Sequence, residues 1–415
     1  MPNLKSEQIR SDLSLDVAPD QALSSKSQED YLRLFLGKEN CEKSKILGRK
    51  VFVYHNKGKN FILLHLAVTY LGGNGQHPIY KKRVQLQSWY KDFCKGITTS
   101  KLPYDVRFIG IYHYQGLVIF VDFQKETYLS KRVHNSSAHI YTNDLFQALK
   151  NGVFYKEDSF GNHIYTIRAN KLIDYLTGNT LGQNVLFSLF EKFNSGFSFG
   201  RWLKVLPTVK EMRNNNWPQW KQKEWPGWYL EYKFERYSLD KKVSPYIKYT
   251  GTKNKRRNSK LQGQYDFDLW FKKQKYYGDL KASDLGSKMA PGNDQKSFIE
   301  CINLYDKFWY IIYEHETQKD TIGNNYKNVR AYNKYISSVV PNSKKGELSY
   351  ANRLKIGVKF VKMTILELNR INFREALKEF NQGHQPDGSA RNPKFLIKKK
   401  DIDRFVVFRF NYHLK

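Results

Sequence analysis

The sequence is short of acidic residues and has no long apolar run. Its 415 residues include 39 Asp and Glu against 70 Lys and Arg, which gives a formal net charge of +31. A chain with this imbalance attracts polyanions, so nucleic acid is the leading expected partner. No stretch approaches the roughly 18 consecutive apolar residues that a membrane helix needs, so no membrane partner is expected.

Cysteine is scarce as well. The three residues, Cys41, Cys94 and Cys301, form no closely spaced pair, so neither a disulfide nor a zinc cluster is expected. Residues 1–21 lack a basic segment followed by an apolar block, so no secretory signal is predicted and we expect a cytoplasmic protein. Glycine-rich nucleotide-binding motifs are also missing from any strand-to-helix setting, so we expect no nucleotide cofactor.

The order of the patterns predicts three regions. Residues 1–27 are polar without a sustained apolar period and are expected to form a flexible arm. Residues 28–190 are rich in strand patterns, among them two apolar runs separated by Gln115 and Gly116, and we expect a strand-rich domain that recognises DNA. Residues 191–415 alternate between helical and strand patterns. The expected fold class is α/β (α+β), with a mixed central sheet and flanking helices in this last region.

Within the last region, individual elements can be predicted. Helices are expected over 228–237, 295–305 and 372–380, paired strands over 265–271 and 276–283, and further strands over 307–314 and 353–368.

The paired strands carry most of the acidic residues in their neighbourhood. In a strand, Asp266 and Asp268 share one face, as do Asp279 and Lys281. A turn centred in residues 272–275 would place Asp268 opposite Asp279, and Asp266 opposite Lys281. Carboxylates this close repel each other, and a divalent cation would turn the repulsion into affinity. We therefore expect a site for Mg²⁺, with Mn²⁺ as a substitute, held by Asp268, Asp279 and Asp266.

A lysine next to such a cation can orient or help to deprotonate a water molecule that attacks phosphorus, which suits phosphodiester hydrolysis. This hairpin resembles the catalytic hairpin of the PD-(D/E)XK nucleases, and most resembles that of a type II restriction endonuclease. The resemblance covers residues 228–315. It implies that Asp268 or Asp266 is the first acid, Asp279 the second and Lys281 the catalytic lysine. No proline precedes either candidate, so the first acid stays open.

Members of that family often have a further acid on the helix before the hairpin. Here the helix offers Glu231 and Glu235, one turn apart on one face. The sequence interpretation favours Glu235 as the catalytic one, and surface pairing with Lys233 and Arg236 is the alternative.

Two segments of the second region mix cations with amides, hydroxyls and rings, and one basic run lies in the third. Such groups neutralise phosphates and bind base edges. The DNA-binding candidates are Lys81, Lys82, Arg83, Gln85, Gln87, Lys131, Arg132, Asn135, Lys255, Arg256 and Arg257.

The resemblance implies a site-specific, Mg²⁺-dependent endonuclease acting on double-stranded DNA. A homodimer would match a twofold recognition site. A cognate DNA methyltransferase is expected in the same system but is not a required physical partner. The alternatives are a repair, recombination or mobile-element nuclease of the same superfamily, or a non-catalytic DNA-binding protein.

Overall fold

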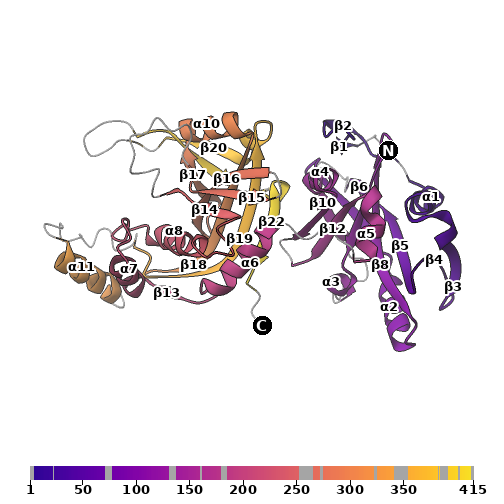
Figure 1. The fold of residues 1–415 in the computed structure, drawn as a ribbon, viewed down its shortest axis with the longest axis horizontal. Coiled ribbons are helices and arrows are strands. Elements are labelled where there is room, and N and C mark those ends of the chain that lie inside the picture. The colour runs from indigo at the N-terminus through magenta and orange to yellow at the C-terminus, as the bar shows by residue number, and fades with distance from the viewer. Residues whose placement is uncertain are drawn as a thin grey trace. The chain divides into compact units, whose positions relative to one another are not determined.

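The computed structural model describes residues 4–21, 23–70, 77–129, 137–158, 161–178, 185–251, 265–271, 274–321, 325–340, 354–381, 383, 391–400 and 402–412. The chain divides into two compact units, residues 1–183 and 184–415 (Figure 1). The predicted α/β class is confirmed, since both units combine sheets with helices. Within the described part of the chain, no helix is long and apolar enough to cross a membrane.

The first unit is built from strands with a few short helices. Its strands are β1 (Lys5–Ile9), β2 (Leu15–Pro19), β3 (Cys41–Ile46), β4 (Arg49–Asn56), β5 (Lys59–Ala67), β6 (Thr69–Tyr70), β7 (Lys81–Gln85), β8 (Tyr104–Tyr114), β9 (Leu117–Phe123), β10 (Ser137–Tyr141), β11 (Val153–Glu157) and β12 (His163–Arg168). Its helices are α1 (Ser25–Leu36), α2 (Tyr90–Thr99), α3 (Lys125–Leu129), α4 (Thr142–Asn151) and α5 (Leu172–Leu176).

Seven of these strands form one sheet in the order β11-β12-β9-β8-β5-β4-β3. All neighbours are antiparallel except β5 and β8, which run parallel. The predicted turn between β8 and β9 is confirmed. Gln115 and Gly116 both have positive φ, 46° and 78°, which suits a two-residue hairpin loop. Helices α1 and α5 cover an apolar core on this sheet that includes Leu32, Phe120 and Leu172.

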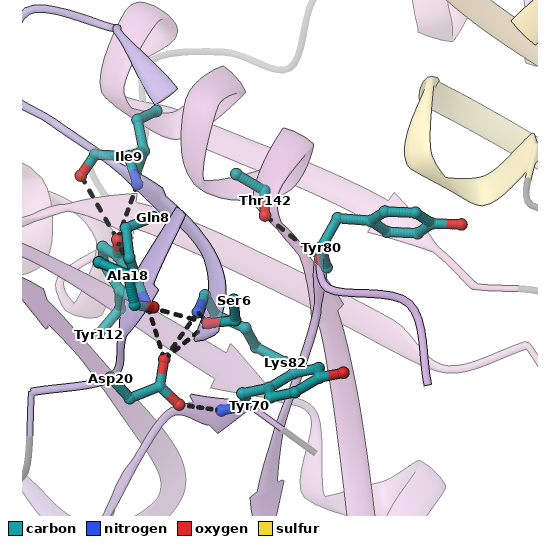
Figure 2. A network of polar contacts seen from close by, with 10 residues as sticks. All are labelled: Ser6, Gln8, Ile9, Ala18, Asp20, Tyr70, Tyr80, Lys82, Tyr112 and Thr142. Carbon is teal, nitrogen blue, oxygen red and sulfur yellow. Dashed lines mark hydrogen bonds and ion pairs between the residues drawn. The ribbon is translucent and has the colours of Figure 1, made fainter. Parts of the chain in front are cut away.

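The flexible arm expected for residues 1–27 is wrong for most of its length. Strands β1 and β2 pair as a hairpin, and α1 follows. The inward side chains of β1 are polar, so the sequence of this buried strand shows no apolar periodicity. Ser6 and Gln8 are both fully buried and bond Asp20 at 3.0 and 2.7 Å. Figure 2 shows this network, which Lys82 joins from β7.

The second unit contains a mixed sheet with helices on both faces. Its strands are β13 (Leu203–Lys204), β14 (Ile247–Tyr249), β15 (Phe267–Phe271), β16 (Gln274–Asp284), β17 (Met289–Asp294), β18 (Lys307–Gln318), β19 (Gly357–Asn369), β20 (Leu377–Phe380), β21 (Lys394–Lys398) and β22 (Val406–Asn411). Its helices are α6 (Val185–Gly196), α7 (Val205–Asn214), α8 (Trp225–Ser238), α10 (Gln295–Tyr305), α11 (Lys327–Val339) and α12 (Phe373–Ala376).

The main sheet has the order β13-β19-β18-β16-β15-β14, and β22 also pairs with β19. Strands β16 and β18 are parallel, and the chain between them passes through β17 and α10. Alternate residues of β18 point to opposite faces. Tyr310 packs against Phe298 of α10, while Trp309 packs against Phe187 of α6. The sheet is therefore buried on both sides, which explains the long apolar run of β18.

Most predicted elements of this unit are confirmed, but the helix expected over 372–380 is wrong. Helix α12 ends at Ala376, and Leu377–Phe380 forms β20, which pairs with β21 in a three-stranded sheet with β17. The partner strand β21 begins at Lys394, outside the predicted helix, so the local periodicity of 372–380 could not reveal the pairing. The three cysteines are free and buried, as expected.

Candidate functional site

The predicted hairpin of β15 and β16 exists, but its predicted register is wrong by two residues. Phe267 pairs with Gly278, and Asp268 pairs with Tyr277, so Asp268 does not face Asp279. The reason is the connection, which consists only of residues 272 and 273 and is centred one residue earlier than expected. Gly278 is required by the close approach of β18, because a Cβ there would lie 2.2 Å from the carbonyl oxygen of Trp309.

The actual register brings Asp266 and Asp279 together. The backbone N–H of Asp266 donates to the Oδ1 of Asp279 at 2.7 Å, and the N–H of Leu280 donates to the Oδ2 of Asp266 at 3.1 Å. Each acid is therefore held by the strand that carries the other. Both residues are buried, with 7% and 4% of their surface exposed. Backbone N–H donors complement the negative charge of the two carboxylates.

Lys281 completes the cluster from β16. Its Nζ lies 2.9 Å from the Oδ2 of Asp279, and its side chain is 17% exposed. Burial lowers the pKa of Lys281, but the charges of Asp279 and Asp266, with a smaller contribution from Glu231, hold that pKa above its ordinary value. The lysine is therefore a positive charge held against Asp279 and influenced by the charge of Asp266.

Helix α8 supplies the nearby carboxylate of Glu231. This residue is buried, and its Oε2 accepts a hydrogen bond of 2.6 Å from the hydroxyl of Tyr249. Burial, followed by the charges of Glu231 and Asp266, raises the pKa of Tyr249 far above its ordinary value. Glu235, which the sequence interpretation favoured, is half-buried one turn later on the helix. The charges of both glutamates raise the pKa of Tyr249, and that of Glu231 also raises the pKa of Lys281.

Asp268 lies on the same face of the hairpin but has different neighbours. Its Oδ2 is 3.3 Å from the Nζ of Lys275, whose ammonium also lies 4.6 Å from the ring centroid of Tyr277. Tyr277 stacks in turn on Tyr305 of α10, with centroids 3.7 Å apart. Asp268 is therefore part of an aromatic and cationic row beside the acid pair. The sequence leaves Asp266 and Asp268 as alternatives for the first acid. The observed register gives the two residues different surroundings.

The donor set fits a hard divalent cation with few protein ligands. Among the residues that the structure describes, no group of three or more His, Cys, Asp or Glu side chains is close enough to hold a metal ion by itself. Mg²⁺ commonly takes only one or two protein carboxylates, together with water and substrate phosphate. Asp266 and Asp279 supply this number, so a cation here would depend on a bound phosphate to complete its ligands.

The predicted DNA-binding residues of the first unit fall on different faces. Lys82 is fully buried and bound to Asp20, so its assignment as a phosphate contact is wrong. Lys81 and Arg83 are partly exposed, and Gln85 is exposed, as is the last candidate of that segment, Gln87. The other predicted DNA contacts, Lys131, Arg132, Asn135, Lys255, Arg256 and Arg257, lie outside the described residues.

Comparison with protein families gives a match to part of the chain. Residues 59–176 match the family model of Methylase-associated X1, and this segment runs from the start of β5 to the last residue of α5. No curated protein matches the chain. The match lies within the first unit, so the acid pair of the second unit is assigned no family by it.

Proposed function

We propose that this protein is a Mg²⁺-dependent endonuclease that cuts double-stranded DNA as part of a restriction-modification system. The observation that carries the proposal is the convergence of Asp266, Asp279 and Lys281 on one hairpin, with Glu231 of α8 beside them. Two acids and a lysine held this closely suit phosphodiester hydrolysis. The net charge of +31 suits a substrate with a phosphate backbone.

Each residue then has a role. Asp266 and Asp279 would hold Mg²⁺, which when bound supplies a Lewis acid for the phosphate and makes the attacking water more acidic. Lys281 provides a fixed positive charge where negative charge develops on the phosphate, and it can orient the attacking water. Glu231, held by Tyr249, adds a further acceptor at the same place.

The Methylase-associated X1 match supports the biological setting. A family described by its association with methylases fits a system in which a methyltransferase protects host DNA from the endonuclease. In this setting the cognate methyltransferase need not bind the protein, and a homodimer would match the symmetry of a twofold DNA site.

The proposal is tested by incubating the full chain with Mg²⁺ and a long, unmethylated duplex of mixed sequence. Discrete fragments that disappear in excess chelator are expected. Asp279→Asn should abolish them, because the amide keeps the hydrogen-bonding oxygen but removes the charge. Asp306→Asn is the matched control, because Asp306 is an exposed acid of the same unit, with 63% of its side chain accessible.

Two other results are informative. Cutting confined to DNA ends, junctions or modified bases would favour the repair or recombination alternative. Binding of the duplex in Ca²⁺, with no cutting in either Mg²⁺ or Mn²⁺, would refute the nuclease and leave a DNA-binding protein.

A further inference from the structure

The small sheet β10-β7-β6 of the first unit has two contrasting faces. Paired residues of antiparallel strands share a face, so the register decides which side chains lie together. Lys82 pairs with Ile140, and Val84 with Ala138, on a face that is buried. The opposite face, called here the front face, has Lys81, Arg83 and Gln85 from β7, with Tyr141 and His139 opposite the two cations and Thr69 of β6 next to Arg83.

The buried face fixes β7 in place. The Nζ of Lys82 lies 2.9 Å from the Oγ of Ser6 and 3.0 Å from the Oδ1 of Asp20, as Figure 2 shows. Gln8 bonds both of these partners, and the hydroxyl of Tyr112 donates to Gln8 at 3.0 Å. The N-terminal hairpin thus holds the strand from behind. A strand held in this way presents its front side chains at fixed spacing.

The front face is cationic. Among the described residues, no carboxylate forms an ion pair with Lys81 or Arg83. Burial, followed by the charge of Lys81, lowers the pKa of His139 to about 4, although Asp158 opposes this shift. His139 is therefore neutral at physiological pH. The face combines two unpaired cations with an amide, an imidazole and hydroxyls.

We propose that the front face of β7 and β10 is the surface that reads the DNA sequence, by entering the major groove. This inference rests on the proposed function, since it requires duplex DNA as the substrate. The major groove admits a two-stranded ribbon, and the residue types match its code. Arg and Lys bind guanine, and Gln binds adenine.

The geometry also predicts a spacing. Alternate residues of a strand are about 6.6 Å apart, and DNA rises about 3.4 Å per base pair. Lys81, Arg83 and Gln85 therefore reach positions about two base pairs apart. A recognition sequence read by this face should contain determined positions at roughly that interval.

The experiment is selection of bound sequences from a pool of duplexes with a randomised centre, in Ca²⁺, using the full chain. The variants are Arg83→Ala and Gln85→Ala. Lys45→Ala is the control, because Lys45 is an exposed cation on β3 in the same unit. Thermal melting of each variant checks that the unit stays folded.

Each variant should relax one selected position by about tenfold or more, with the two positions about two base pairs apart. The control variant Lys45→Ala should select the same DNA sequence as the wild-type protein. The inference is overturned if both front-face variants select the wild-type sequence with wild-type affinity, or if the wild-type protein selects no sequence. Asp279-dependent cleavage of long duplex DNA is scored separately. Cleavage without any effect of Arg83 or Gln85 defeats only this inference, whereas absence of cleavage defeats the proposed function.

Discussion

Asp266, directly before β15, and Asp268, within it, give the sharpest test of the hairpin register. Asp266 and Asp268 are two residues apart and share a face, but only Asp266 is held against Asp279. We predict that Asp266→Asn abolishes most cleavage, while Asp268→Asn preserves it. The substitution is mild, because an asparagine oxygen can still accept the hydrogen bond that Leu280 donates to Asp266. Only the charge is lost.

The two substitutions should differ by orders of magnitude in their effect on the cleavage rate. Removing one positioned electrostatic group from an active site commonly costs about 2.7–4 kcal/mol in the transition state, a rate factor of roughly a hundred to a thousand. Asp268 instead pairs with Lys275, whose side chain is 37% exposed. The Asp268 side chain is only 10% exposed, but its ion pair is with Lys275 and not with Lys281. Asp268→Asn should therefore change cleavage by less than about threefold.

The assay is single-turnover cleavage with DNA saturated by enzyme in Mg²⁺, measured alongside affinity for the same DNA in Ca²⁺. Both variants should bind DNA nearly as well as the wild-type protein. Loss of cleavage in Asp268→Asn together with survival in Asp266→Asn would refute the assignment drawn from the register. Equal loss in both would show that the two acids act as one group.

Three further predictions concern other residues. Lys281→Ala should lose at least about a hundredfold in single-turnover cleavage with near-normal DNA affinity, whereas a surface lysine would lower affinity instead. Glu231→Gln should slow cleavage more than Glu235→Gln in the same assay, because the charge of Glu231 helps to raise the pKa of Lys281. A larger effect of Glu235→Gln would instead support Glu235 as the catalytic acid. Lys82→Ala should lower the free energy of unfolding by about 3 kcal/mol, since it strands the carboxylate of Asp20, while Lys81→Ala should cost under about 0.5 kcal/mol in urea titration.

The hairpin of β15 and β16 could be predicted because its residue types and alternation are local. Its register could not, since a strand pattern of period two looks the same after a shift of two residues. A shift of two residues puts Asp268 in the place of Asp266 opposite Asp279. Only the length of the connection, residues 272 and 273, decides which of them meets Asp279.

The N-terminal hairpin shows a different limit. Strand β1 buries Ser6 and Gln8, which hydropathy assigns to the surface. Their burial is stabilised by Asp20 and Lys82, whose positions are separated by 62 residues of sequence. Polar contacts between residues this far apart produce no periodic pattern in the sequence, which explains why the sequence wrongly predicts Lys82 as a DNA contact.

The reciprocal hydrogen bonds of Asp266 and Asp279 also bear on how this site can change over evolutionary time. Each carboxylate is anchored by a backbone N–H of the opposite strand, at Asp266 and at Leu280, so each acid keeps its anchor when the other is replaced, and their coupling lies in the cation that both would hold. Residues that work as a unit show strongly non-additive effects on rate. Once one acid has mutated, selection has little activity left to preserve in the second. Descendants of this chain should therefore keep the pair intact or lose both members together.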